Sequence, residues 1–297
     1  MVSTDMIDAD IFSAFAKENS PDEAVRKFVN PQKDEKPLAI QLGGANVSNL
    51  LYAMEILQPY ADLYDYNIGC PLGYMLGKKG GCYLMKHPDQ LYKIVAQLSK
   101  VCKPKGIPLT VKMRSGWDTE SINAHEIAPQ LEKLGVDAIT LHPRTRKQGY
   151  RDRADWVLAR KVKDLLTIPL ILSGDVTNSY MAHMAFTHVK CDFVMVGRAA
   201  KNNPSVFLEL NEYLASGKEP VKPDKAYGKK TSQARKDWGE FLGLYKEREH
   251  RFLLSELKDH ALWMAKECRN NAKVTEHILQ AKNENDLTLI FGSISFG

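Results

Sequence analysis

Cys70 stands where a reacting side chain is expected. It lies in the stretch D-Y-N-I-G-C-P (65–71), which begins within a predicted strand at Asp62–Tyr66 and ends that strand with a glycine and a proline. Barrel enzymes place reacting groups on loops at the carboxyl ends of strands. A cysteine is also a common small buried apolar residue, so its neighbours decide between the two interpretations. Three glycines and two lysines at 77–81 predict a mobile basic segment just downstream.

Polar residues or glycines also end the other predicted strands. These run over residues 37–42, 62–66, 107–113, 138–142, 168–172 and 192–196 and alternate with predicted helices. At or just after their carboxyl ends lie Gln41, Asn67, Lys112, His142, Ser173 and Gly197. Alternation of this kind demands a parallel sheet covered by helices, and functional groups at successive strand ends favour a TIM-type (β/α)8 barrel over a doubly wound sheet. With a partial strand at Met1–Met6, the strand count is one short of eight.

The pattern changes in the last third of the chain. A helix predicted from Asn203 to about Leu214 is followed by a segment rich in Lys, Pro and Gly. Residues 231–249, 252–268 and 272–283 are helical by periodicity and carry charges of both signs. We therefore expect three parts: a barrel domain over 1–216, a linker over 217–230 and a small α-helical bundle over 231–297.

The composition is that of a globular protein with a mild basic excess. The chain has 297 residues and a formal net charge of +5, which is compatible with a polyanionic partner. Its five cysteines are scattered without a C-x-x-C pair, which argues against a disulfide framework and against a zinc site. No apolar run approaches the roughly 20 residues of a membrane span, and no signal pattern opens the chain. We expect a cytoplasmic protein without metal, and a monomer by default.

Six segments, in order along the first two thirds of the chain, resemble one enzyme family. They are A-I-Q-L-G-G (39–44), N-I-G-C-P (67–71), V-K-M-R-S-G-W (111–117), L-H-P-R-T-R (141–146), S-G-D-V (173–176) and V-G-R-A-A (196–200). Together they resemble the tRNA-dihydrouridine synthases. The resemblance implies an FMN-dependent oxidoreductase that acts on a CH–CH group: it reduces the C5=C6 bond of a uridine in tRNA, with NADPH as reductant. It also implies that the C-terminal bundle helps to hold tRNA.

The sequence departs from the family pattern in three places. The family begins with a strand and loop of the type A-P-M-x-G-V-T-D, which is absent here, so the resemblance implies a barrel that lacks its first strand and the flavin contacts of that strand. Ser173 stands where the family usually has Asn, and Asp152 stands where it often has Gly.

The resemblance assigns a flavin site to the strand ends. Phosphate in such barrels binds to backbone N–H groups of the last two strand–helix loops. Ser173, Gly174, Asp175, Gly197 and Arg198 fall there. The flavin ring is expected to meet Gln41, Asn67 and Lys112, and a lysine ammonium stabilises the negative charge of a reduced flavin. His142 is expected to bond to the flavin or its phosphate.

The resemblance gives Cys70 the role of general acid. Reduction of a uracil needs a hydride at C6 and a proton at C5, and a thiol with a reference pKa of about 8.5 can supply that proton. Nucleophilic catalysis would instead need a thiolate beside a base, and the spacing alone does not separate the two roles.

The expected RNA contacts combine charge and stacking. Arg114, Arg144, Arg146 and Tyr150 lie in the loops after two neighbouring strands, and Asn67 is expected to hold the uracil edge. Two other functions stay open: a flavin barrel that acts on a free pyrimidine, as dihydroorotate dehydrogenases do, and a non-catalytic tRNA-binding relative. The arginine-rich loop and the helical C-terminal part argue against a small free substrate.

Overall fold

The computed structural model of the chain describes residues 1–220, 231–247, 254–266 and 268–295. The chain divides into two compact units. Unit 1 comprises Met1–Asp175 with Ala185–Met195, and unit 2 comprises Val176–Met184 with Val196–Gly297. The predicted linker at 217–230 lies outside the described residues from 221 onward, so the domain boundaries drawn from the sequence stay a prediction.

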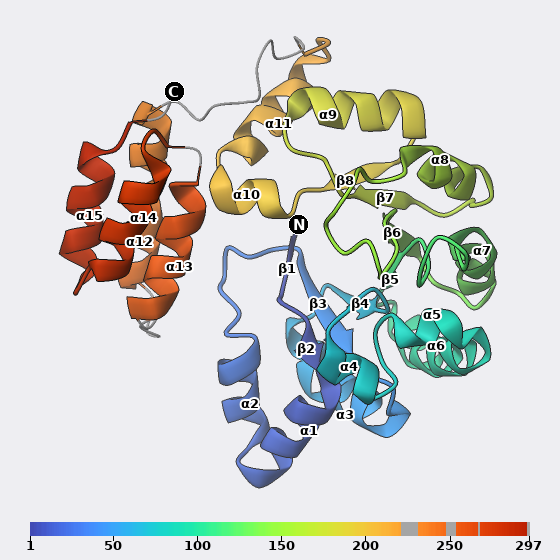
Figure 1. Ribbon diagram of the computed structural model, residues 1–297. Coiled ribbons are helices and arrows are strands. Elements are labelled where there is room, and N and C mark those ends of the chain that lie inside the picture. Colours follow the sequence, from blue (N-terminus) through green and yellow to red (C-terminus); the bar gives the residue numbers. More distant parts are fainter. Residues whose placement is uncertain (221–230, 248–253, 267, 296–297) are drawn as a thin grey trace. The chain divides into compact units, whose positions relative to one another are not determined.

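A curled parallel sheet forms the centre of unit 1 (Figure 1). Its strands follow the order β1-β3-β4-β5-β6-β7-β8, and β2 also pairs with β3. The strands are β1 (Val2–Ser3), β2 (Ile7–Asp8), β3 (Leu38–Gly43), β4 (Leu63–Asn67), β5 (Leu109–Arg114), β6 (Ala138–His142), β7 (Leu170–Ser173) and β8 (Phe193–Met195). Each ladder between them is parallel, and none joins β8 to β1 within the described residues. The predicted class, an incomplete barrel of α/β type, is confirmed.

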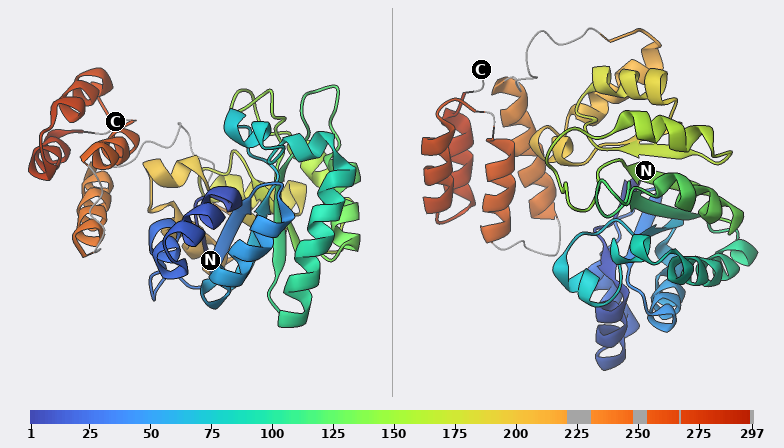
Figure 2. Two further views of the ribbon diagram at one scale, coloured as in Figure 1. Left: turned by 90° about the horizontal axis from the view of Figure 1, so that it is seen from below. Right: turned by 45° about the vertical axis from the view of Figure 1, so that its right-hand side comes forward.

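Helices cover the outer face of the sheet, as the alternation predicts (Figures 1 and 2). The helices of unit 1 are α1 (Ala9–Glu18), α2 (Pro21–Phe28), α3 (Val47–Leu57), α4 (Gly73–Gly77), α5 (Tyr83–Lys86), α6 (Pro88–Cys102), α7 (Ala124–Lys133) and α8 (Trp156–Asp164). Short 3-10 turns occupy Gln58–Tyr60 and Lys103–Lys105, and a π-helical turn occupies Ala185–Val189. Consecutive helices α6, α7 and α8 contact one another along the outside of the strands.

The amphipathic pattern of α6 explains how this layer attaches. Leu91, Ile94, Val95 and Leu98 form one face, as predicted, and all four are buried. On β4, Tyr64 points toward the same outer layer, where its hydroxyl donates to the carbonyl of Met54 in α3. Residues next to Tyr64 in the strand therefore face the opposite, inner side of the sheet.

The loop after Cys70 is more ordered than its glycines predict. It contains the short helices α4 and α5, and Met75 of α4 is fully buried. The Lys78 ammonium lies 2.8 Å from the carboxylate of Asp8, which also caps α1 through the backbone N–H groups of Asp10 and Ile11. This ion pair ties the basic segment to the start of the sheet.

Unit 2 is helical. Its helices are α9 (Ser179–Met184), α10 (Arg198–Asn202), α11 (Val206–Ser216), α12 (Thr231–Glu247), α13 (Leu254–Met264), α14 (Asn271–Gln280) and α15 (Glu284–Ser293). The side chain of Trp238 stacks on Phe291 with ring centroids 4.3 Å apart, inside a core drawn from the last four helices. The sequence pattern predicted three helices in this bundle and missed α15. Residues 248–249, 252–253 and 267 of the predicted helices lie outside the described part.

Candidate active site

Polar side chains line the inner face of the sheet toward the carboxyl ends of β3, β4 and β5. The register pairs Gln41 with Asp65 and Asp65 with Thr110, so these three residues form one row across the strands. Two positions further along, Asn67 pairs with Lys112 in the next row. Because side chains alternate between faces with a period of two, both rows point to the inner side.

A continuous chain of hydrogen bonds links these rows to the loop that carries Cys70. The Nε2 of Gln41 donates to Oδ2 of Asp65 over 2.6 Å, and the Nδ2 of Asn67 donates to Oε1 of Gln41 over 2.7 Å. The backbone N–H of Gly69 then donates to Oδ1 of Asn67 over 2.9 Å. Gln41, Asp65 and Asn67 are all buried, so these bonds are shielded from competing water.

Lys112 brings a positive charge to the same face. Its side chain is half-buried, and no hydrogen bond or ion pair of its ammonium is found within the described residues. Burial lowers the pKa of Lys112, and the nearby carboxylate of Asp65 opposes that shift. Burial in turn raises the pKa of Asp65, against the hydrogen bonds from Thr110 and Gln41 and the charge of Lys112. Lys112 and Asp65 thus lie near one another on the inner face, and the N–H groups of Lys112 stay available to a ligand.

The backbone around Cys70 is fixed from several sides. The carbonyl of Gly69 accepts hydrogen bonds from Nε of Arg114 (3.0 Å) and from Sγ of Cys82 (3.1 Å). The carbonyl of Cys70 accepts one from the N–H of Cys82 over 3.0 Å. Gly81 has a φ of +56°, and a Cβ there would lie 2.5 Å from the Cys70 carbonyl oxygen, so only glycine fits. Cys70 itself is 8 % exposed.

Cys82 is a neutral thiol in this arrangement, and we expect it to resist alkylation. Burial raises its pKa to about 12, so at pH 8 the thiolate fraction is roughly a thousandfold below that of an ordinary cysteine. Iodoacetamide labelling at pH 8, read by peptide mass spectrometry, should leave Cys82 unmodified in the folded chain. Equally fast labelling of Cys82 in the folded and urea-unfolded chain would contradict this. The contribution of this thiol to stability is present below pH 9 and is lost as the pH rises toward 12.

Two of the predicted RNA-contacting arginines are buried and bonded to the protein itself. Besides its bond to Gly69, Arg114 donates through Nη1 to the carbonyls of Thr145 and Gly149, over 3.1 and 3.0 Å. Arg144 donates through Nη2 to the carbonyl of Asp152 over 2.8 Å. The two guanidinium groups thus hold the loop after β6 in place.

Arg144 also joins the loops after β6 and β7. Its Nη2 lies 2.6 Å from Oδ1 of Asp175, and its Nη1 lies 3.1 Å from Nε2 of His142. The other carboxylate oxygen of Asp175 accepts from the N–H of Ala154 over 2.7 Å. A Cβ at Gly174 would lie 2.7 Å from the His142 ring, and the φ of Gly174 is +104°. The predicted residues His142, Arg144, Gly174 and Asp175 are therefore brought together.

The remaining predicted residues of unit 1 are more accessible. Tyr150 is 61 % exposed, and the guanidinium of Arg114 lies 5.8 Å from its ring centroid. The guanidinium of Arg146 lies 4.7 Å from the ring centroid of Trp117, and the ammonium of Lys86 lies 4.8 Å from it. Cationic and aromatic groups thus lie side by side on the segments that follow β4, β5 and β6. We call this surface, with Lys86, Trp117, Arg146 and Tyr150, the rim.

Backbone geometry explains one departure from the family pattern. Asp152 has a φ of +58°, in the left-handed region where glycine carries no steric cost. Asp tolerates this region better than most residues, and the carbonyl of Asp152 is where Arg144 is bonded. Ser173, a second departure, ends β7 and pairs in register with Met195.

Gly197 and Arg198 lie in unit 2, where they begin the five-residue helix α10. Ser173, Gly174 and Asp175 lie in unit 1. A phosphate site composed of both segments accordingly stays a prediction.

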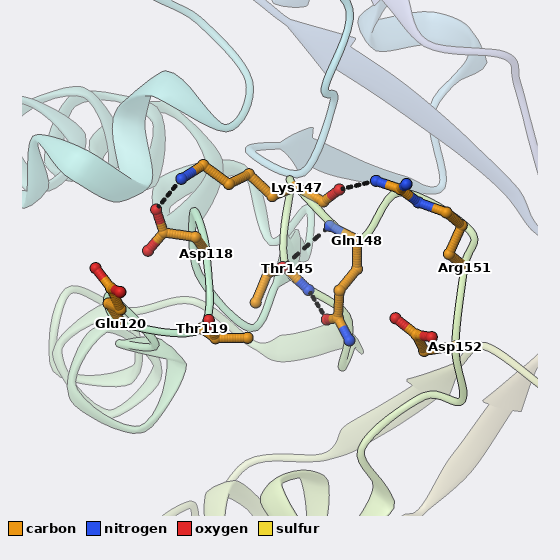
Figure 3. A pocket seen from close by; sticks show the side chains of 8 residues that line it. All are labelled: Asp118, Thr119, Glu120, Thr145, Lys147, Gln148, Arg151 and Asp152. Carbon is orange, nitrogen blue, oxygen red and sulfur yellow. Dashed lines mark hydrogen bonds and ion pairs between the residues drawn. The ribbon is translucent and has the colours of Figure 1, made fainter.

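A polar pocket of about 330 Å³ opens on the rim between the loops after β5 and β6 (Figure 3). Its lining residues are Asp118, Thr119, Glu120, Thr145, Lys147, Gln148, Arg151 and Asp152. The Lys147 ammonium lies 2.8 Å from Asp118, and its hydrogen bond lowers the pKa of Asp118 to about 2. Neither Cys70 nor Lys112 lines this pocket, so we assign the chemistry to the strand ends instead.

Sequence reasoning missed Asp65, Thr110 and Cys82. Asp65 lies in the predicted strand at 62–66 and precedes Asn67 by two positions, and this period of two was the available signal that both face one side. Thr110 could be found only through the pairing of β4 with β5. Nothing in the spacing indicates that Cys82 returns to the carbonyl of Gly69.

A family model for dihydrouridine synthases matches residues 3–291. The chain belongs to the dihydrouridine synthase family. A protein named probable tRNA-dihydrouridine synthase, from Rhizobium leguminosarum bv. phaseoli, is 37 % identical over 170 residues, which cover 57 % of this chain and 53 % of that protein. The tRNA-dihydrouridine synthase B of Proteus vulgaris is 34 % identical over 180 residues, covering 60 % of this chain and 55 % of that protein.

The matched part of the chain thus spans little more than half the length of these dihydrouridine synthases. Among solved structures, a FabK mutant from Thermotoga maritima aligns with a TM-score of 0.40 and 16 % identity, covering 61 % of this chain and 50 % of that one. That likeness is too low to bear on function. None of the described helices is long and apolar enough to cross a membrane.

Proposed function

We propose that this member of the dihydrouridine synthase family is an FMN-dependent tRNA-dihydrouridine synthase. The observation that carries the proposal is the position of Cys70: the thiol sits on a clamped loop at the carboxyl end of β4, next to the rows that hold Asn67 and Lys112. A thiol on a rigid loop, beside amide donors and a cation, is suited to protonate a held, electron-poor ring.

The strand-end residues fit a flavin. Lys112 offers an ammonium without a protein hydrogen bond in the described residues, and the amides of Gln41 and Asn67 each retain one N–H beyond the chain described above. These donors suit the carbonyl oxygens and anionic N1 region of an isoalloxazine. His142 and the backbone at Ser173–Asp175 are the proposed phosphate side. When bound, the flavin would supply the hydride for C6 of uracil.

Cys70 then supplies the proton for C5. Among the chain's groups, Asn67 is the proposed holder of the uracil edge, because it lies three residues before Cys70 and its orientation is fixed by Gly69. The thiol proton leaves to C5 as the C5=C6 bond is reduced, and solvent restores it afterwards. A buried thiol on a fixed loop keeps the proton directed at one face of the base.

Accessible groups of the rim are the proposed RNA contacts. Arg146 and Tyr150, with Trp117 and Lys86 beside them, combine charge for phosphates with faces on which an extruded base can stack. Arg114 and Arg144, which were predicted for the same task, are proposed to act indirectly by holding the loop that presents these groups. The charged helices of unit 2 are the proposed second tRNA contact.

The function is tested with unmodified tRNA, FMN and NADPH. Nucleoside mass spectrometry should detect dihydrouridine in tRNA incubated with the chain, and NADH in place of NADPH reports the reductant preference. Parallel reactions with free uridine monophosphate and orotate test the small-pyrimidine alternative. Turnover of the free pyrimidines without tRNA turnover would contradict the proposal. Tight tRNA binding without bound flavin would support the non-catalytic relative instead.

Lys112→Met should make the reduction potential of bound FMN more negative. Removal of the ammonium destabilises the reduced, anionic flavin more than the oxidised one, and a tenfold change in that preference corresponds to about 30 mV for a two-electron couple. Spectroelectrochemical titration measures the shift. Lys36→Met, at an exposed lysine before β3, is the control and should leave the potential unchanged. An unchanged potential in Lys112→Met would remove Lys112 from the flavin site.

A further inference from the structure

Asp65 is the least expected group on the inner face of the sheet, because it is a carboxylate with only 4 % of its surface exposed. Burying a carboxylate is costly unless its oxygens are hydrogen-bonded. Both are: Oδ1 accepts from the hydroxyl of Thr110 over 2.7 Å and Oδ2 accepts from Gln41 over 2.6 Å. If Asp65 only stabilised the fold locally, the hydrogen bonds from Asn67 to Gln41 and from Gly69 to Asn67 would not be needed.

The chain from Asp65 to Gly69 has a fixed direction. A backbone N–H can only donate, so Gly69 fixes the Oδ1 of Asn67 as acceptor and turns its Nδ2 toward Gln41. Gln41 then accepts through Oε1, which leaves Nε2 as the donor toward Asp65. The last member must be an acceptor, and a carboxylate satisfies this in either of its orientations. If the side-chain amide of Gln41 or Asn67 were flipped, at least one hydrogen bond of this series would be lost.

We propose that Asp65 is a positioning residue for the Cys70 loop. By accepting from Gln41 it completes the series of hydrogen bonds that keeps Oδ1 of Asn67 on the Gly69 N–H, and this bond sets where Cys70 lies. The carbonyl side of Gly69 is held independently by Arg114 and Cys82. Release of the N–H side therefore loosens the Cys70 loop without unfolding it. The inference deepens the proposed function and rests on it for the identity of Cys70 as the acid.

The test measures the alkylation of Cys70 by iodoacetamide at pH 8 in the purified full-length chain, by peptide mass spectrometry, with no tRNA or NADPH present. Asp65→Leu removes the acceptor and should speed Cys70 labelling about five- to tenfold, the ratio expected for loss of one buried hydrogen bond. Asp65→Asn should rescue the wild-type rate, because its carbonyl can accept from Gln41 while its amide donates to Thr110. Thr110 is buried beside Asp65 but takes no part in the hydrogen bonds from Asp65 to Gly69. Cys70 in Thr110→Val should therefore also be labelled at the wild-type rate.

Three results would overturn the proposal: Cys70 labelling in Asp65→Leu at the wild-type rate, equal acceleration in Asp65→Asn, or equal acceleration in Thr110→Val. The second would assign the effect to charge, and the third to general packing. If Asp65→Leu fails to fold, Gln41→Met removes the next member of the same series of hydrogen bonds. It must then accelerate the labelling of Cys70 by a similar factor. The readout needs neither flavin nor tRNA, so a chain that makes no dihydrouridine yet shows this pattern would refute the proposed function and leave the role of Asp65 standing.

Discussion

Cys70→Ala is expected to slow dihydrouridine formation about 10²- to 10⁴-fold, the usual contribution of a positioned general acid. The loop backbone is held through Gly69 and Cys82, so the substitution should leave the site's shape intact. Flavin binding and its reduction by NADPH should therefore be unchanged, while transfer to tRNA is slowed. Rapid mixing of the reduced variant with tRNA, quenched and read by nucleoside mass spectrometry, measures the affected step.

Cys102→Ala is the matched control. Cys102 is also a buried cysteine, but it ends α6 before the amino end of β5, at the other end of the strands from Cys70. The Cys102→Ala variant should form dihydrouridine at the same rate as the wild type. A Cys70→Ala chain that reduces tRNA within a few-fold of the wild type would contradict the acid role, and a Cys70→Ala chain that no longer binds flavin would indicate a structural one.

Arg144→Leu is expected to lower the free energy of unfolding of unit 1 by about 3 kcal/mol. Loss of the buried guanidinium leaves the half-buried carboxylate of Asp175 with the N–H of Ala154 but without its ion-pair partner, and the carbonyl of Asp152 loses its donor. Urea denaturation followed by tryptophan fluorescence measures the change, because Trp156 is bonded to the carbonyl of Gly174 beside this cluster.

Arg160→Leu serves as the comparison for Arg144→Leu. Arg160 makes a similar contact with Asp164, at 2.9 Å, but the pair lies on the solvent side of α8 and should matter little. Equal urea midpoints for the Arg144 and Arg160 variants would mean that Arg144 does not hold the loops together. Arg144 would then be available as an RNA contact, as the sequence pattern first predicted.

Much of the fold follows from local pattern. Strand periodicity and the apolar face of α6 predicted the parallel sheet and its helical cover, because burial of one face is encoded in short windows. The helix α15 was missed because its pattern is weakly amphipathic, and α4 and α5 were missed because glycines dominate their segment. There the loop is ordered by the distant ion pair of Lys78 with Asp8, which no local pattern contains.

The sequence predicted which residues belong to the site better than it predicted what each of them does. Gln41, Asn67, Cys70 and Lys112 could be placed at strand ends because loops follow strands in a known order. Arg114 and Arg144 have the same appearance in sequence as Arg146, and only the fold decides which arginines bond to loop carbonyls and which face outward. Buried hydrogen-bond partners such as Asp65 and Thr110 depend on strand register, which sequence spacing does not specify.

An anaerobic single turnover tests directly whether the chain transfers reducing equivalents from flavin to tRNA. The chain is loaded with FMN, reduced by one equivalent of NADPH and mixed with unmodified tRNA, while flavin absorbance and tRNA dihydrouridine are followed together. We expect reoxidation of the flavin on addition of tRNA, with one dihydrouridine formed for each flavin reoxidised. Flavin that binds and is reduced but stays reduced in the presence of tRNA would contradict it.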